Sequence, residues 1–168
     1  MSNRREVRAY DYVNHPYEAV RDTLFAGPLA VFRKATMTAL RDEPGSGAEL
    51  RAKLGPITVT QEVAIEVVEI RAATSPTNQP ATELVLEWKA MRQSGLFPTM
   101  RATLSVYPLS ATETQLDLAG TYDPPLGMLG DVIDAISMHK VAQSSITGFI
   151  QEVAGFLRAP PPAAAPRE

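Results

Sequence analysis

Hydrophobic and polar residues alternate along the middle of the chain, with the period of two that is typical of β-strands. In one such segment Leu84, Leu86, Trp88 and Ala90 share a face, and the residues between them are mostly charged. We therefore predict an antiparallel meander with one buried and one hydrated face. Its strands, separated by short turn sequences, are expected at residues 83–90, 101–107 and 115–122.

Further strands are expected earlier in the chain. Residues 50–54 and 63–67 alternate in the same way, and a Gly55-Pro56 break follows the first of them. The turn sequence of residues 74–80 follows the second segment and leads into the meander. Together with an N-terminal strand around residues 7–13, these segments predict a sheet of about six or seven strands.

The N-terminal strand holds a charged residue on its apolar face. Val7, Ala9 and Val13 share that face with Asp11. A buried carboxylate is costly unless a cation pairs with it. We expect Asp11 to be solvated on an edge strand, and Arg92 or Arg101 to be its partner if it is not.

Helices are expected on either side of the strands. Asn14 can cap a helix whose first turn holds Pro16 and Glu18, and a second short helix is expected over residues 28–40. Residues 126–157 carry apolar side chains at helical spacing and predict one long amphipathic helix. Asp131 and Asp134 in its early turns are explained by the helix dipole.

This order of elements predicts an α+β fold. A helix over residues 126–157 would be about 45 Å long, whereas six or seven strands make a sheet roughly 25 to 30 Å wide. The sheet can cover such a helix by curving around it, with the two short helices closing one end. We expect this arrangement to leave a cavity between the sheet and the helix.

Composition narrows the possible functions. The 168 residues suit one domain, expected over residues 1–158, with a Pro/Ala-rich disordered tail over residues 159–168. The chain has no Cys, which excludes thiolate metal sites, disulfides and cysteine nucleophiles. Its two His cannot alone complete a zinc site. The net charge of −3 disfavours a nucleic-acid partner. We expect no membrane span, no cofactor and a cytoplasmic location; the oligomeric state stays open.

Two segments resemble a known superfamily. VNHPYEAV at residues 13–20 is similar to its strand-to-helix connection, and GTYDPPLG at residues 120–127 is similar to the turn before its long helix. KLGPI at residues 53–57 resembles a strand break in one branch. On these segments the chain resembles the START-like, polyketide-cyclase-like (SRPBCC) superfamily. The resemblance implies the helix-grip fold and an intracellular pocket for hydrophobic ligands, in a superfamily of carriers, cyclases, hydrolases and regulators.

Candidate ligand contacts follow from the face that each residue shares. His139 and Gln143 fall on the inward stripe of the last helix, where an imidazole and an amide can orient a ligand. A histidine at the stripe's edge with a purely structural role is the alternative. Trp88 can instead fill the core, and Tyr122 can instead support the turn at the end of its strand. The proposed lining of the pocket is Leu84, Leu86, Trp88, Ala102, Leu104, Leu118, Tyr122, Ile136, His139 and Gln143.

Three functions are compatible with these patterns. The first is a carrier or sensor that binds a small hydrophobic or amphipathic molecule, including a lipid. The second is an enzyme of the cyclase or dehydratase type, in which His139 shuttles a proton. The third is a protein-interaction module with a filled core. Motifs for nucleotide binding, serine hydrolysis and zinc proteolysis are absent from the sequence.

Overall fold

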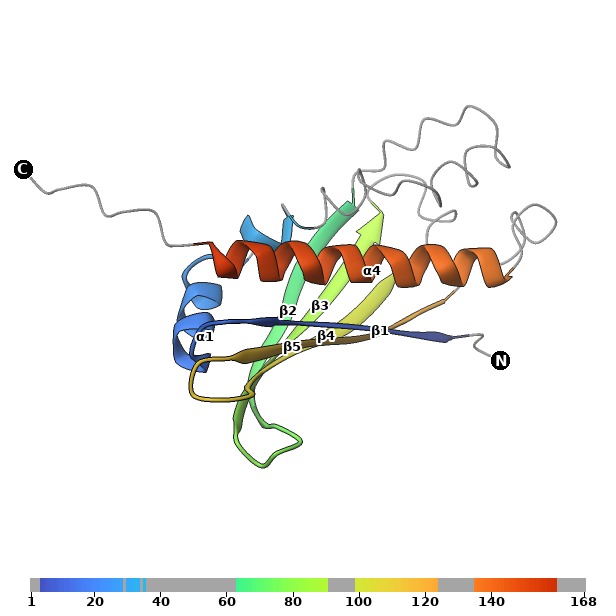
Figure 1. Ribbon diagram of the computed structural model, residues 1–168. Coiled ribbons are helices and arrows are strands. Elements are labelled where there is room, and N and C mark those ends of the chain that lie inside the picture. The colour runs from blue at the N-terminus through green and yellow to red at the C-terminus, as the bar shows by residue number, and fades with distance from the viewer. Residues whose placement is uncertain are drawn as a thin grey trace, which may run out of the picture.

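The computed structural model describes residues 4–28, 30–33, 35, 63–90, 99–123 and 135–159. Within them, a curved sheet lies against one long helix, and a shorter helix lies at the end of the sheet (Figure 1). None of the helices in these ranges is long and apolar enough to cross a membrane. The elements are β1 (Arg5–Val13), α1 (Tyr17–Ala26), β2 (Val63–Thr74), β3 (Pro80–Ala90), β4 (Met100–Pro108), β5 (Thr114–Tyr122) and α4 (Ala135–Arg158).

The predicted antiparallel meander is confirmed. The described strands form a five-stranded sheet in the order β1-β5-β4-β3-β2, and all neighbours are antiparallel. The sequence predicts six or seven strands, and the strand expected at residues 50–54 lies outside the described residues. The buried face is the predicted one, but Val85 on the opposite face is also buried, at 4% exposure.

The strand register aligns side chains of the buried face in rows across the sheet. One row contains Tyr122, Met100 and Trp88, which are cross-strand neighbours on β5, β4 and β3. The next row contains Gly120, Ala102 and Leu86 on the same strands. Large side chains therefore alternate with a row that is small on β4 and β5.

Helix α4 lies along β1 and covers the buried face of the sheet (Figure 1). The predicted apolar stripe is confirmed in its C-terminal part. The helix was expected to begin near residue 126, but residues 124–134, including Asp131 and Asp134, lie outside the described residues. The stripe residues with little or no exposed surface are Ile146, Phe149, Ile150, Val153 and Leu157.

Polar side chains of α4 hold the helix to β1 at two points. The Gln143 amide donates to the Arg8 carbonyl and accepts from the Arg8 backbone N–H. Arg158, in the last turn, donates to the Tyr12 carbonyl and forms an ion pair of 2.6 Å with Asp11. The expectation of a solvated Asp11 is therefore wrong, because its side chain is only 18% exposed and Arg158 pairs with it.

Helix α1 begins at Tyr17, directly after Pro16. Asn14 was expected to cap this helix, but the capping position belongs to Pro16 and no side chain caps the helix. Pro16 suits a helix start because its fixed φ is compatible with the first turn. Residues 28, 30–33 and 35 are helical, as predicted for the second short helix, and residues 36–40 lie outside the described residues.

Candidate functional site between the sheet and α4

The sheet residues of the predicted lining lie on the face that α4 covers. All of them are at most 7% exposed and belong to one apolar cluster. The prediction of their shared orientation is therefore confirmed. They are Leu84, Leu86 and Trp88 on β3, Ala102 and Leu104 on β4, and Leu118 and Tyr122 on β5.

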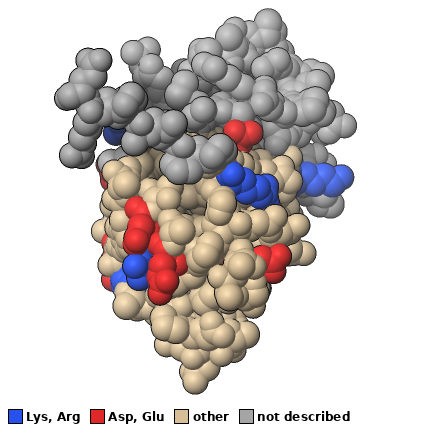
Figure 2. All heavy atoms as spheres, turned by 60° about the vertical axis from the view of Figure 1, so that its left-hand side comes forward, with Lys and Arg blue, Asp and Glu red and all other residues tan. Residues whose placement is uncertain are grey.

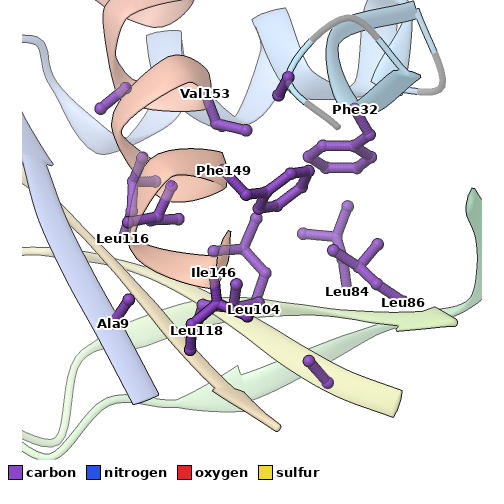
Figure 3. Close-up of a cluster of buried hydrophobic side chains, with 14 of the residues drawn as sticks. Ala9, Phe32, Leu84, Leu86, Leu104, Leu116, Leu118, Ile146, Phe149 and Val153 are labelled. Carbon is purple, nitrogen blue, oxygen red and sulfur yellow. The ribbon is translucent and has the colours of Figure 1, made fainter. Parts of the chain in front are cut away.

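Under the C-terminal half of α4 this interior is filled by side chains. The Phe149 ring meets Trp88 edge-on at 5.2 Å and lies 5.9 Å from the ring of Phe32. Figure 3 shows Phe149 pointing from the helix into the apolar cluster, with Phe32 beside it. Leu104 and Leu118 have no accessible surface, so no space large enough for a water molecule adjoins them. This region is packed core.

The N-terminal half of α4 has a different environment. Ala142 is only partly buried, and His139 is also partly accessible. The sheet residues in the small row beneath are Gly120 and Ala102, and a Cβ atom added to Gly120 would lie 2.7 Å from the Ala102 Cβ. Glycine is therefore required by the close approach of β4 and β5. The sheet face is therefore built from smaller side chains here than beside Phe149 and Trp88.

A polar pair lies at this end of the interior. The Tyr122 hydroxyl is 3.4 Å from His139 Nδ1, and the two rings stack with centroids 6.4 Å apart. Tyr122 is only 2% exposed, and its burial raises the pKa of its phenol. The hydroxyl is consequently protonated at neutral pH, and it can donate to Nδ1 or accept from it, depending on the histidine tautomer.

The helix residues of the predicted lining are placed in different ways. His139 reaches Tyr122 and therefore lies near the sheet. The amide of Gln143 already bonds the backbone of Arg8 on β1, so it fixes the helix to the edge strand. Ile136 lies in the first turn of α4, and its side chain is outside the described residues. The structure thus brings His139 and Tyr122 together at one end of the lining.

The outer face of the sheet also carries a hollow, of about 480 Å³, lined by Arg8, Tyr10, Tyr107, Gln115 and Asp117. The Arg8 guanidinium and the Asp117 carboxylate form a bidentate pair there. This bond raises the pKa of Arg8 above its usual value. Because the two charges satisfy each other, the hollow offers little charge to a ligand.

The described part of the chain groups no three metal-ligating side chains in the manner of a metal site. Among the described residues between the sheet and α4, apolar side chains lie beside the phenol of Tyr122 and the imidazole of His139. These groups can bury a hydrophobic molecule and orient it by one or two hydrogen bonds.

Sequence reasoning missed some of the residues that shape this region. Nothing in the sequence pattern indicated that Arg158, in the last turn of the helix, would bond β1. Gly120 was assigned to the correct strand, but its close contact with Ala102 depends on the register between β4 and β5. The alternation within each strand was visible in the sequence, whereas the pairing of strands was not.

Comparison with known proteins gives no match to a family model and no match among curated proteins. Several solved structures are similar in overall arrangement. The Zhui aromatase/cyclase from Streptomyces sp. R1128 has 14% sequence identity and a TM-score of 0.46, over 92% of this chain and 94% of that one. A conserved protein from Geobacillus kaustophilus has 10% identity and a TM-score of 0.49, over 91% and 95%. Ara h 8.0201 has 8% identity and a TM-score of 0.45, over 92% and 98%.

At these identities the likeness concerns the fold alone. The chain's own topology defines its fold. An antiparallel sheet in the order β1-β5-β4-β3-β2 curves around the C-terminal helix, and α1 follows the first strand. The chain has the helix-grip architecture.

Proposed function

We propose that this protein binds a small hydrophobic or amphipathic molecule between the sheet and the N-terminal half of α4. The observation that carries the proposal is the Tyr122–His139 pair, a polar contact at the end of an otherwise apolar lining. Gly120 and Ala102 form the small row of the sheet face next to this pair, and we propose that the ligand lies over them. A cytoplasmic location is part of this proposal.

Apolar burial would supply most of the affinity, at about 25 cal/mol for each Å² of apolar surface removed from water. The phenol and the imidazole would orient one polar group of the ligand, as polar groups do in mostly apolar pockets. Ala142 and Met100 are partly buried apolar residues next to the same cluster and complete the proposed wall.

Binding of dansyl amide tests this proposal. The dye accepts energy from excited tryptophan, and Trp88 is the only tryptophan in the chain. We expect saturable energy transfer from Trp88 to the dye, and we expect Ala142→Phe to abolish it by filling the proposed space. Ala119→Phe places the same ring on the exposed outer face of the sheet and serves as the control. Equal transfer in both variants would refute the site.

Catalysis is the second candidate function, and the 3.4 Å contact between the Tyr122 hydroxyl and His139 Nδ1 favours it. In such a cyclase or dehydratase-type enzyme, His139 would move a proton while the apolar walls exclude water. His139→Ala separates the two functions. The variant would keep most of its affinity for the dye in either case. Only an enzyme would in addition lose turnover of its substrate.

The third candidate, an interaction module with a filled core, is favoured by the aromatic packing of Phe149, Trp88 and Phe32. This packing occupies the C-terminal half of the interior. The module becomes the better account if dansyl amide produces no saturable transfer from Trp88 in the native chain.

A further inference from the structure

A second hollow lies away from the proposed ligand site, where the start of α1 meets the turns β2–β3 and β4–β5. This groove has a volume of about 540 Å³, and its lining includes Pro16, Tyr17, Arg21, Pro80, Pro108 and Ser110. We call it the proline groove. Figure 2 shows the side of the molecule that faces left in Figure 1, where most of the described surface consists of uncharged side chains.

One aromatic ring, that of Tyr17, lies in the wall of the proline groove beside proline rings. The Tyr17 hydroxyl bonds the Thr82 hydroxyl at 2.7 Å, which holds the tyrosine ring in place. The Arg21 guanidinium lies 5.7 Å from the centre of the same ring. Proline rings on neighbouring elements add flat apolar surface. Grooves lined by aromatic rings are typical binding sites for proline-rich segments in the polyproline II conformation.

The chain itself contains such a segment. Residues 159–168 have the sequence APPPAAAPRE and follow α4 directly. Proline fixes φ near the polyproline II value, so ordering this segment costs less conformational entropy than ordering an average one. We propose that residues 159–168 dock in the proline groove of the same chain.

The end of α4 lies close enough for this contact. Arg158 donates to the carbonyl of Tyr12, so the last helical turn is anchored beside the end of β1. The chain from Tyr12 to Pro16 spans at most about 14 Å when fully extended. Residues 159–166 in a polyproline II helix extend about 25 Å, at about 3.1 Å per residue. The tail can therefore reach the groove, at the high effective concentration of a short tether.

Charge supports the same pairing. Glu18 is exposed and lines the proline groove, and the tail carries Arg167 directly after Pro166. Arg21, also in the lining, forms an ion pair of 3.0 Å with Asp22. Among the residues that line the groove, Glu18 is the one with a carboxylate, and the Arg167 guanidinium can approach it.

Paramagnetic relaxation enhancement in the full chain tests the docking. The chain has no Cys, so Glu168→Cys creates a unique position for a nitroxide label. We expect the amide signals of Gln79, Ser110 and Ala111 to lose intensity with the oxidised label and to recover on reduction. The amide signal of Glu6, at the other end of the sheet, is the internal control. Uniform intensities across these amides would overturn the proposal.

A mixed sample and two charge-reversal variants test whether the tail docks within its own chain and through Glu18. In a mixture of isotope-labelled native chain and unlabelled spin-labelled chain, intramolecular docking predicts no loss of intensity. Loss of intensity in this mixture would show that a second copy supplies the tail, and it would overturn docking within one chain. Glu18→Arg should weaken the effect, and Glu18→Arg combined with Arg167→Glu should restore it. These amides are far from the proposed dye site, so the outcome is independent of dansyl amide binding.

Discussion

The two halves of the interior beneath α4 are built from different side chains. Under the C-terminal half, Phe149 packs against Trp88 and Phe32, and the leucines of β4 and β5 have no accessible surface. Under the N-terminal half, partly exposed His139 and Ala142 face a sheet row that contains Gly120 and Ala102. The first half is packed core, and the second is the half in which we propose that a ligand binds.

The same division explains how the helix is attached. Gln143 and Arg158 bond the backbone of β1, which is the outermost strand on its side among the described strands. Bonds of this kind cover backbone groups that would otherwise be free at the edge. These bonds hold the helix along β1 at two points. The apolar packing around Phe149 lies in the C-terminal half of the helix.

The largest effect is expected from removing the central ring of the packed half. Phe149→Ala should lower the free energy of unfolding by about 3–5 kcal/mol, because it leaves a cavity between Trp88 and Phe32. His139→Ala in the other half should cost far less, since its ring is partly accessible. Urea denaturation of the two variants measures both. Similar losses would contradict the division of the interior into two halves.

A smaller loss is expected where the small row is enlarged. Gly120→Ala should destabilise the protein by about 1–3 kcal/mol, because the new methyl group overlaps the Ala102 side chain. Gly155→Ala is the matched control, since nothing lies within 4 Å of a Cβ atom at that exposed helical position. The control should stabilise the protein by roughly 0.5–1 kcal/mol. Thermal unfolding of both variants should show shifts of opposite sign, and a stabilising Gly120→Ala would contradict the close approach.

The attachment of α4 to β1 predicts a further loss. Gln143→Ala removes both bonds to the Arg8 backbone and should cost about 0.5–1.5 kcal/mol for each bond lost. Amide hydrogen exchange at Arg8 should accelerate in this variant, whereas exchange at the buried strand β4 should not. Gln143→Glu keeps the acceptor for the Arg8 N–H and should show a smaller acceleration. Unchanged exchange at Arg8 would show that the amide does not protect the strand.

The smallest expected effect concerns pH. Burial raises the pKa of Tyr122 in the folded state above its usual value near 10. Its contribution to stability is therefore fully present below about pH 10 and is lost as the pH rises through the folded-state pKa. Tyr122→Phe should reduce the fall in stability above pH 10, as measured by denaturation at several pH values. An identical pH dependence in the variant would contradict the burial of this phenol.

The sequence predicted the faces of the strands better than their partners. Alternation around Leu86 and Leu118 identifies the buried face because one side of an antiparallel sheet is apolar. Asp11 was misjudged because its partner, Arg158, is distant in the sequence and approaches only after α4 packs on β1. The Asn14 cap was wrong because Pro16 occupies the capping position of α1.

The candidate site was predictable only in part. Helical spacing placed His139 on the inward stripe. Its contact with Tyr122 depends on where along β5 the helix α4 packs, which the spacing does not give. Gln143 lies on the same stripe, yet its amide bonds the edge strand. Spacing gives the direction of a side chain along a helix, and the packing of the helix on the sheet decides which neighbour it meets.

The ligand site is tested most directly by nuclear magnetic resonance of the native chain during titration with dansyl amide. The account predicts saturable shifts of the Ala142 methyl group and of the His139 ring nitrogens, with little change at Ile150 and Val153 in the packed half. Absence of saturable shifts at Ala142 and His139, or equal shifts along the whole of α4, would contradict it.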